Sequence, residues 1–372
     1  MKIHRVTAWA VHLPNADGPY WMSGNRVTTG MDTVVVRVMS DDGTFGIGES
    51  GCVGVTWDAH DPHTQVTGVA KLASAVLGAD PQSPPAVHRC MTAAMTGHPY
   101  VKAPIDMAVW DLAARAAGVP VWKLLGGDGP EPTPLYRPVQ GASPELSVAK
   151  AHERLAQGYR RLQVKVGDDP IGDAARVLAV REAVGDDVVI FADANCGFSV
   201  SAARRFVRAL GTDGAGIFLE QPCPTLTDCA QLRDSWTGPM VMDETIVSLA
   251  ALLEAKRLGV ADGVTIKLTR VGGITPARVI RDAAVEMGIG VTVEDASGCD
   301  LADTAFAHMN ASTPARLRVH SVDFNSWVTL NHVIGASPRD GSFLRPQAEA
   351  PGFGLTLNEG LLGTPFVDVQ SR

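Results

Sequence analysis

The sequence contains no uninterrupted apolar run that approaches the roughly 18 residues of a membrane-spanning helix. Its first residues alternate between apolar and polar side chains, with neither the apolar core nor the small-residue cleavage site of a secretory signal. It also lacks a long run of one charge sign, although 40 acidic and 32 basic residues give a formal net charge of -8. We therefore expect a cytoplasmic protein that binds neither membranes nor nucleic acids.

The cysteine spacing of a disulfide framework or a zinc site is also missing. The six cysteines are scattered along the chain and form no Cys-x-x-Cys pair. In a chain of 372 residues this distribution is typical of reduced thiols rather than of a small cross-linked fold. We expect these side chains to serve packing.

What the sequence does contain is a change of organisation at the glycine-rich segment 126–130. Before it, alternating runs such as residues 33–38 and the turn at 41–43 predict an antiparallel sheet, and residues 103–117 predict a largely buried helix. After it, apolar runs of strand length alternate with helical stretches. The eight predicted strands cover residues 135–139, 162–166, 188–193, 217–220, 240–243, 263–267, 290–294 and 317–320.

Strands that alternate with helices in this way predict an α/β fold, a (β/α)7-8 barrel of the TIM type behind an α+β capping domain. A doubly wound open sheet is the competing architecture, but no Gly-x-Gly-x-x-Gly loop follows a strand. We predict a capping domain with substrate-covering loops at 1–127, a barrel with a metal site at 128–335, and a segment at 336–372 that returns to the capping domain. In such a barrel the carboxyl ends of all strands meet at one mouth.

Three acidic residues, Asp193, Glu220 and Asp243, end consecutive predicted strands. Neighbouring strands lie about 4.8 Å apart, so the three carboxylates would repel one another strongly without a cation. Ligation by oxygen alone suits Mg²⁺, with Mn²⁺ as the alternative. One such acid could equally cap a helix or pair with an arginine, but three in succession favour a metal site.

Two lysines accompany these acids. Lys165 lies on the second predicted strand and Lys267 on the sixth, which places them on opposite sides of an eight-stranded ring. Burial and a nearby dication would lower the pKa of either ammonium group, so that a neutral fraction could act as a base. Bases on opposite faces of a substrate suit stereochemical inversion. For either lysine alone, a structural role or Schiff-base formation is the alternative, and the metal site disfavours an imine.

Longer motifs surround these residues. The chain reads Gln-Val-Lys-Val-Gly at 163–167, Asp-Ala-Asn at 193–195, Glu-Gln-Pro at 220–222, Asp-Glu at 243–244 and Ile-Lys-Leu-Thr-Arg at 266–270. With residues 102–112, they resemble the enolase superfamily in its muconate-lactonizing and mandelate-racemase-like branch, over essentially the whole chain. The resemblance implies a homo-oligomer whose three acids bind Mg²⁺ and whose two lysines form the acid/base pair, a pattern already described for such sites.

One position departs from the common pattern of that branch. Many members carry Lys-x-Lys on the second strand, whereas this chain has Gln163 two residues before Lys165. The pKa of Lys165 then depends more on the metal and on burial. The Gln-x-Lys form is most similar to members that act on proline derivatives, namely hydroxyproline-betaine 2-epimerases, proline racemases and cis-3-hydroxyproline dehydratases.

In this family two capping-domain loops close over the barrel mouth, and here they correspond to residues 17–22 and 51–57. Their aromatic rings could pack on an apolar ring or stack on a cationic nitrogen, and acids after the seventh strand could pair with an ammonium group. The alternatives are that the rings anchor their loops and that Asp295 caps a helix. The predicted substrate-binding residues are Tyr20, Trp21, Trp57, Gln163, Asn195, Glu294, Asp295 and Trp327.

The expected substrate is a small carboxylate, and its nitrogen is cationic if it is an amino acid or a betaine. Loss of its α-proton gives an enediolate, whose second negative charge the metal stabilises. A proton returned to the opposite face makes the protein a racemase or epimerase, which is our first hypothesis. Loss of a β-hydroxyl instead makes it a dehydratase of cis-3-hydroxyproline or a sugar acid. A barrel that binds ligand without turnover is the alternative of another class.

Overall fold

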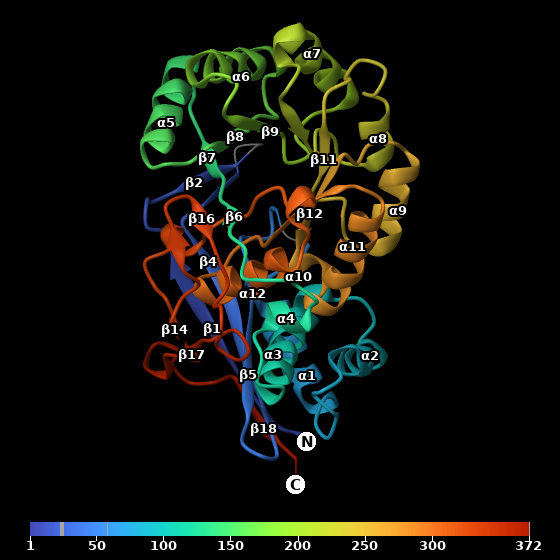
Figure 1. Ribbon diagram of the computed structural model, residues 1–372, viewed down its shortest axis with the longest axis vertical. Coiled ribbons are helices and arrows are strands. Elements are labelled where there is room, and N and C mark those ends of the chain that lie inside the picture. Colours follow the sequence, from blue (N-terminus) through green and yellow to red (C-terminus); the bar gives the residue numbers. More distant parts are fainter. Residues whose placement is uncertain (23–25, 58, 372) are drawn as a thin grey trace.

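The computed structural model describes residues 1–22, 26–57 and 59–371 (Figure 1). It consists of a small antiparallel sheet with its own helices and a curled parallel sheet surrounded by helices. The predicted fold class, a TIM-type barrel behind an α+β capping domain, is confirmed, whereas the exact domain boundaries stay a prediction. In the described part of the chain, no helix is both long and apolar enough to cross a bilayer.

The capping domain contains a four-stranded antiparallel sheet in the order β18-β1-β4-β5. Its strands are β1 (Ile3–Pro14), β4 (Gly30–Ser40), β5 (Phe45–Cys52) and β18 (Val367–Gln370). Helices α1 (Pro62–Ala75) and α3 (Pro99–Ala116) pack on this sheet, α2 (Pro84–Ala94) packs on them, and α4 (Val121–Leu124) follows. A hairpin of β2 (Tyr20–Met22) and β3 (Arg26–Thr28) extends toward the barrel (Figure 1).

Strand β5 lies unusually close to α3, the helix predicted from residue 103 onward. Gly46 and Gly48 make this approach possible, because a Cβ atom at Gly46 would overlap the carbonyl oxygen of Ala108 and one at Gly48 that of Pro104. Without side chains at these two positions, the strand backbone rests directly on the helix backbone.

We expect Gly46→Ala and Gly48→Ala to lower the free energy of unfolding by about 1–3 kcal/mol each, because the added methyl group must push strand and helix apart. Urea denaturation followed by circular dichroism measures this effect. Gly129→Ala is the matched control, since the nearest atom to its new Cβ would lie 3.9 Å away. Equal denaturation midpoints for the Gly46 and Gly129 variants would contradict the steric argument.

The parallel sheet has seven strands in the order β13-β12-β11-β10-β9-β8-β7. The first seven predicted strands are therefore observed, with ends shifted by at most two residues. The strands are β7 (Arg137–Val139), β8 (Arg161–Lys165), β9 (Val189–Asp193), β10 (Phe218–Glu220), β11 (Met240–Met242), β12 (Gly263–Lys267) and β13 (Gly290–Glu294).

The eighth predicted strand, at 317–320, is wrong, because these residues do not form a regular strand. A short 3-10 helix, Ala315–Leu317, occupies its start and leaves too few residues for a regular ladder. The chain still closes the ring, because Arg318 bridges to Val291 on one side and Ser321 bridges to Leu135 on the other, both in parallel. The eighth position of the barrel is thus held by isolated bridges.

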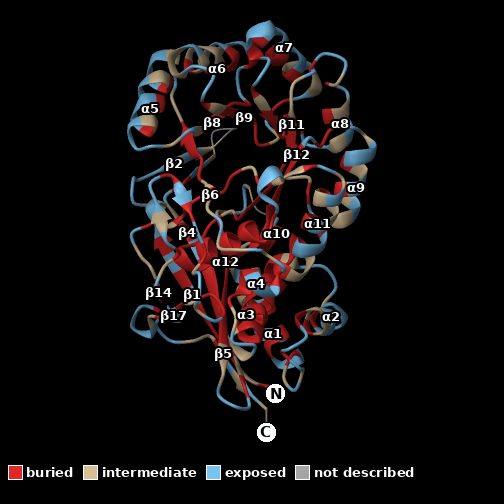
Figure 2. Ribbon diagram, viewed as in Figure 1, coloured by how far each residue is buried: buried red, intermediate tan, exposed pale blue. Residues whose placement is uncertain are grey.

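Helices cover the outside of the barrel, and the strands are buried between them and the interior (Figure 2). These helices are α5 (Pro144–Ala156), α6 (Pro170–Val184), α7 (Val200–Leu210), α8 (Leu226–Ala230), α9 (Leu249–Arg257), α11 (Ile274–Glu286) and α12 (Asp300–Ala311), whereas the single turn α10 (Leu268–Val271) follows β12 and packs on α3. The first five begin at side-chain caps that accept a backbone N–H of the first turn: Ser143, Asp169, Ser199, Thr225 and Ser248. These caps define where each loop at the barrel mouth ends.

The remaining elements are short. They are the strands β6 (Thr133–Pro134), β14 (Val333–Ile334), β15 (Arg339–Asp340), β16 (Phe343–Leu344) and β17 (Thr356–Leu357), and the 3-10 helices Gly211–Gly214, Asn325–Trp327 and Glu359–Leu361. Strand β16 pairs with β15 and β6, and β17 pairs with β14. The segment after the barrel therefore packs mainly through loops.

His308 joins α12 to α4. It is fully buried, and its Nδ1 accepts the backbone N–H of Trp122 at 3.0 Å. Burial lowers the pKa of His308 from 6.5 to about 3. The unfolded chain would therefore bind a proton below about pH 6.5 that the folded protein does not bind.

It follows that the free energy of unfolding should fall as the pH drops from 6.5 toward 3, with His308 contributing a loss of about 2 kcal/mol at pH 5. His308→Gln retains a hydrogen-bond acceptor but cannot titrate, so its stability should depend less steeply on pH. Urea titrations at a series of pH values compare the two proteins. Parallel pH profiles for wild type and variant would contradict this assignment.

Candidate active site

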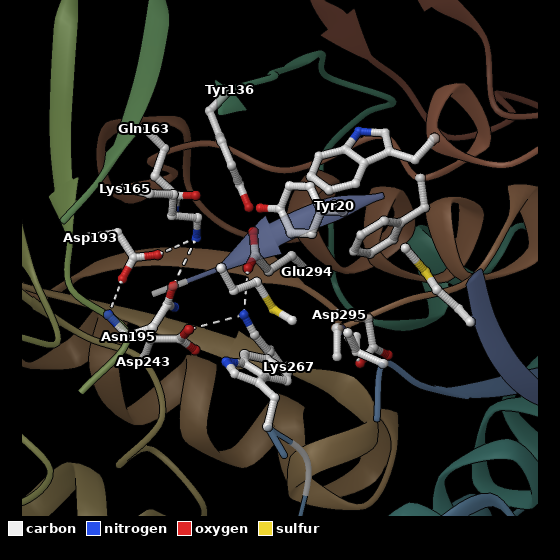
Figure 3. A pocket seen from close by; sticks show the side chains of 17 residues that line it. Tyr20, Tyr136, Gln163, Lys165, Asp193, Asn195, Asp243, Lys267, Glu294 and Asp295 are labelled. Atoms are coloured by element: carbon white, nitrogen blue, oxygen red, sulfur yellow. Dashed lines mark hydrogen bonds and ion pairs between the residues drawn. The ribbon is translucent and has the colours of Figure 1, made fainter. Parts of the chain in front are cut away.

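A cavity of about 50 Å³ lies at the carboxyl ends of the barrel strands (Figure 3). The capping domain closes it with Tyr20, Met22, Met31, Val53 and Trp57. The barrel side contributes Tyr136, Gln163, Lys165, Asp193, Asn195, Asp243, Lys267, Glu294, Asp295, Ala296, Phe324 and Trp327. The wall thus combines charged groups from the strand ends with rings from the covering loops.

The three predicted metal ligands end adjacent strands and are at most 2% exposed. Asp193 and Asp243 line the cavity, whereas Glu220 does not reach its wall. The oxygens of Glu220 accept hydrogen bonds from Gln163 Nε2 at 2.9 Å and Thr265 Oγ1 at 3.2 Å. Burial, together with repulsion from the other two carboxylates, raises the pKa of Glu220 well above its usual range.

The two lysines approach the cavity from β8 and β12, with three strands between them (Figure 3). Lys165 Nζ lies 2.6 Å from Asp193 Oδ2 and 3.1 Å from Asn195 Oδ1. Lys267 Nζ lies 3.0 Å from Asp243 Oδ2 and 2.8 Å from Glu294 Oε1. Each ammonium group is therefore paired with one of the strand-end acids.

These ion pairs determine the pKa values of the lysines in the absence of a cation. Burial lowers the pKa of Lys165, but the Asp193 carboxylate raises it, and the net pKa is above the usual value. Burial also lowers the pKa of Lys267, but Asp243 and Glu294 raise it well above the usual value. The lowered lysine pKa values were predicted for a site that holds a dication and stay a prediction; without a cation, the strand-end carboxylates outweigh burial.

Seven of the eight predicted substrate-binding residues line the cavity, and Trp21 does not. Trp21 lies between Tyr20 and Met22 on β2, so its ring points to the other face of the hairpin and is 54% exposed. The prediction for Trp21 is therefore wrong, because the run of three residues forms a strand whose side chains alternate. Tyr20 packs against Trp327, with ring centroids 4.9 Å apart.

Trp57 lies in the cavity wall as predicted, beside two cations of the protein. Its ring lies 5.1 Å from Lys267 Nζ and 5.3 Å from the guanidinium carbon of Arg270. It therefore contacts the cations of the protein itself and covers the Lys267 side of the cavity.

The two acids after β13 differ in their roles. Glu294 Oε1 binds Lys267, whereas its Oε2 is buried and has no hydrogen-bond partner among the described residues. Asp295 accepts hydrogen bonds from the hydroxyl and the backbone N–H of Thr269, at the start of α10. Burial raises the pKa of Asp295 to about 7. Asp295 thus acts mainly as a helix cap, while Glu294 keeps one oxygen free.

Arg270, Glu244 and Tyr136 are polar residues in or beside the cavity that were not predicted. Arg270 Nη1 lies 2.6 Å from Asp243 Oδ1, and Glu244 Oε1 accepts a hydrogen bond from Asn195 Nδ2 at 3.0 Å. Burial raises the pKa of Glu244 to about 7. Glu244 follows Asp243 directly and Arg270 lies three residues after Lys267, so the motifs quoted above could have indicated both residues. Tyr136 precedes β7 and lines the cavity without any pattern that marks it.

The backbone is strained where strands β9 and β10 end. Asn195, Cys196 and Gln221 have φ values of +42°, +65° and +31°, a region that residues other than glycine rarely adopt. The side chain of Gln221 accepts the backbone N–H of Asp243 at 2.9 Å. Neighbouring strand ends are thereby linked by hydrogen bonds, which fixes the directions of their acidic side chains.

The donor set at these strand ends fits a hard divalent cation. Three buried carboxylates lie on adjacent strands, and the raised pKa of Glu220 records a repulsion that a cation would relieve. The oxygens of the three acids do not all lie within 4.8 Å of one another in the described structure. Metal binding would therefore require their side chains to move together and to loosen the lysine pairs.

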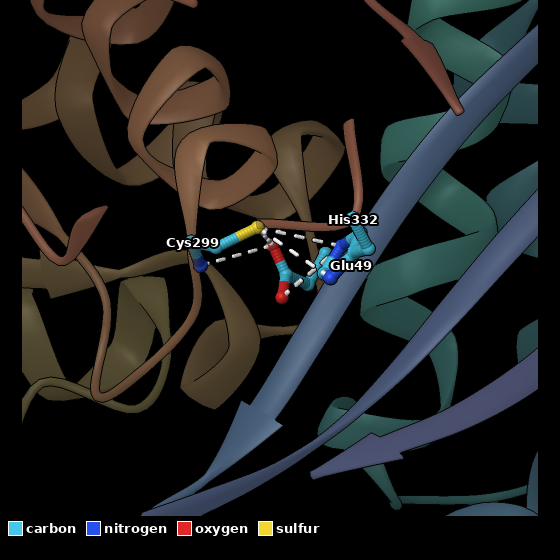
Figure 4. A group of neighbouring side chains, drawn as sticks. All are labelled: Glu49, Cys299 and His332. Carbon is cyan, nitrogen blue, oxygen red and sulfur yellow. Dashed lines mark hydrogen bonds and ion pairs between the residues drawn. The ribbon is translucent and has the colours of Figure 1, made fainter. Parts of the chain in front are cut away.

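One other trio does bring three potential ligand atoms within 4.8 Å: Glu49, Cys299 and His332 (Figure 4). The Cys299 sulfur lies 3.5 Å from both ring nitrogens of His332, which places it over the ring face and away from either lone pair. Glu49 Oε2 accepts the N–H of Ala302 at 3.0 Å. We interpret this trio as a cap that joins β5 to the start of α12, rather than as a metal site.

Comparison with known proteins agrees with this fold. Residues 5–126 match the mandelate racemase / muconate lactonizing enzyme N-terminal domain, and residues 147–361 match the enolase C-terminal domain-like family. A cis-3-hydroxy-L-proline dehydratase of Roseibium aggregatum is 34% identical over 98% of this chain and 99% of its own length. An N-succinyl-L-Arg/Lys racemase of Bacillus cereus is 30% identical over 99% of this chain and all of its own.

A comparison with a solved structure agrees with these sequence matches. An enolase-superfamily member from Roseovarius nubinhibens, crystallised with magnesium, superposes with a TM-score of 0.94 at 33% identity, and the match covers the full length of both chains. Because the relatives are racemases, epimerases, dehydratases and cycloisomerases, the protein is an enzyme and not a silent binding barrel. The chain belongs to the enolase superfamily, in the branch of mandelate racemase and the muconate-lactonizing enzymes.

Proposed function

We propose that the enzyme removes the α-proton of a small carboxylate substrate and returns a proton to the opposite face, as a racemase or epimerase. The observation that carries this proposal is the placement of Lys165 and Lys267 on two sides of one narrow cavity, with three strands between them. A single base would suffice for one-sided proton exchange, whereas inversion needs a proton donor on each face.

Asp193, Glu220 and Asp243 would hold one Mg²⁺ ion, with Mn²⁺ as the alternative. A magnesium-bound relative with a TM-score of 0.94 supports this assignment. When bound, the ion would supply positive charge that stabilises the substrate carboxylate as it gains negative charge and that counters the carboxylates now raising the lysine pKa values.

The lysines would then move the proton. Neutral Lys165 Nζ takes the α-proton from one face, the electron pair of the C–H bond shifts toward the substrate carboxylate, and the Lys267 ammonium gives a proton to the other face. The roles exchange for the opposite isomer. Trp57 and Arg270 keep Lys267 in place, since the ring covers its Nζ and the guanidinium shares Asp243 with it.

The cavity supports a compact substrate with a cationic nitrogen. Its volume of about 50 Å³ and its wall of Tyr20 and Trp327 suit a small ring. The free Oε2 of Glu294 would accept a substrate N–H, or face a quaternary nitrogen without a hydrogen bond. Proline, hydroxyproline and their betaines combine these properties, and we propose them as the substrate class.

A second candidate is the dehydration of cis-3-hydroxyproline. The relative from Roseibium aggregatum with that name, 34% identical over nearly the whole chain, favours it. The first step is the same, but the electron pair of the broken C–H bond then expels the β-hydroxyl as water after protonation. The product is an enamine rather than the epimer.

Isotope exchange separates these candidates. The enzyme with Mg²⁺ in D₂O would be incubated with proline, trans-4-hydroxyproline, cis-3-hydroxyproline and the corresponding betaines, and ¹H NMR would follow the α-proton. We expect deuterium incorporation with inversion for at least one compound. Water loss from cis-3-hydroxyproline without inversion of any other compound would favour the dehydratase. No exchange with any of them would contradict the substrate class.

A further inference from the structure

A second cavity, of about 190 Å³, lies behind one wall of the candidate active site. Tyr20 and Trp327 line both cavities, so these two rings form the partition between them. The second cavity also contains Arg137, Lys150 and Arg154, and we call it the arginine cavity. It is large enough for several water molecules or a small polyatomic ion.

Arg137, on β7, is a buried cation without an acidic partner. It is 8% exposed, and no carboxylate oxygen of the described residues lies within 4.0 Å of its guanidinium. Its Nη1 donates to Ser326 Oγ at 2.7 Å, while its Nε is buried without a partner. A buried guanidinium in this state is costly, because aromatic contacts and one hydroxyl replace only part of its hydration.

Arg154, on α5, likewise has an Nε donor without a partner among the described residues, although it pairs with an acid. It is 8% exposed, and its Nε is also buried without a hydrogen-bond partner. Its Nη1 contacts Glu153 at 3.3 Å and Gln157 at 3.1 Å. Burial lowers the pKa of Arg154, and the nearby charge of Arg137 lowers it further. Two buried guanidinium groups thus repel each other and each keeps an unused donor.

Asp17 is the obvious candidate for the missing counter-charge, but it does not fill that role. It lines the arginine cavity from the loop before β2, yet it is exposed and forms no ion pair within 4.0 Å in the described structure. Lys150 is already paired with Glu153 at 2.8 Å. The cavity is lined by three cationic side chains, Arg137, Lys150 and Arg154. Even if Asp17 and Glu153 are both counted as counter-charges, one positive charge stays in excess.

We propose that the arginine cavity binds a small oxyanion, a carboxylate or phosphate group, between Arg137 and Arg154. Guanidinium groups present several donors in a planar fork, which matches the oxygens of such groups. Because Tyr20 and Trp327 form the partition, the anion also steadies the wall of the active site. This inference does not depend on the proposed reaction.

Calorimetric titration of the full chain with inorganic phosphate at constant ionic strength tests the site. We expect one phosphate per chain. Arg137→Met and Arg154→Gln should each weaken binding at least about tenfold. Asp17→Asn should strengthen it, because this change removes a competing negative charge. Arg208→Gln, an exposed arginine on α7, is the matched control and should bind like wild type.

Thermal denaturation distinguishes the anion site from a purely structural role of the arginines, and the anion site gives the following expectation. Arg137→Met should keep or raise the melting temperature in anion-free buffer, since it removes an unpaired buried charge, and should abolish the rise that phosphate produces in wild type. The proposal is overturned if phosphate fails to bind, if Arg137→Met binds it like wild type, or if Asp17→Asn weakens binding. Because Asp17 is exposed, its variant tests the site even if an arginine variant does not fold.

The oxyanion could be free in solution or belong to the substrate. If it is free, phosphate and acetate should leave the apparent affinity for a monocarboxylate substrate unchanged or improve it. If it belongs to the substrate, phosphate should compete with amino acids that carry a second carboxylate. Either result supports an anion site and identifies its source.

Discussion

Replacing Lys165 or Lys267 by alanine should reduce inversion of the substrate by about 100-fold to 10,000-fold, because each variant lacks the proton donor or acceptor on one face. The two variants should differ in isotope exchange. Each should still exchange the α-proton of the one isomer that presents its hydrogen to the remaining lysine. The measurement is ¹H NMR in D₂O, starting separately from each isomer of the substrate identified in the panel.

Lys71→Ala, which removes an exposed lysine from α1, is the matched control and should behave like wild type. Circular dichroism should first establish that the site variants fold, because each removes a partner from a buried carboxylate. Exchange of both isomers at wild-type rates in both site variants would remove these lysines from the mechanism. Loss of exchange for the same isomer in both would mean that they work on one face.

Removal of the metal should have an equally large effect. Chelation should abolish turnover, and Mg²⁺ at 100 times its dissociation constant should stabilise the folded protein by about 2.7 kcal/mol. Glu220→Gln should lose this stabilisation. In chelator, however, this variant should be more stable than wild type, because burial and two neighbouring carboxylates disfavour the charged form of Glu220.

Asp243→Asn should show the opposite behaviour in chelator. It leaves Lys267 and Arg270 with one carboxylate fewer, so it should destabilise the protein even without metal. Urea denaturation with and without Mg²⁺ compares the variants, and Glu286→Gln, an exposed change on α11, is the control. If Glu220→Gln kept the full response to Mg²⁺, Glu220 would not be a ligand.

Much of the barrel was predictable because its strands are buried on both faces. Such strands read as short apolar runs, and a charge at the end of a run stands out. Asp193, Glu220 and Asp243 were found in this way, and the structure places all three at neighbouring strand ends. Their assignment as metal ligands stays a proposal.

The failed predictions share a different cause, since they depend on neighbours that are distant in sequence. The side of the hairpin on which Trp21 lies is set by pairing between β2 and β3. The irregular eighth position depends on a 3-10 turn that a short apolar run does not reveal.

The arginine cavity illustrates the same limit. Arg137 and Arg154 lie on different elements, and nothing in their local sequence shows that each keeps a buried Nε without a partner in the described structure. Only the folded chain brings their guanidinium groups together behind Tyr20 and Trp327. A charge count along the sequence assigns every arginine a solvated surface role, and these two are among the exceptions because α5 packs beside β7.

Strand β5 connects three features that were described separately. Its glycines rest on α3, its Glu49 caps α12, and beyond Cys52 the chain continues to Trp57 in the cavity wall. From Gly46 to Cys52 the strand spans about 20 Å, with both ends held by packing. A displacement at the α3 end would therefore be transmitted along a stiff segment to the ring that covers Lys267. Substitutions at Gly46, far from any substrate, should consequently alter catalytic constants as well as stability.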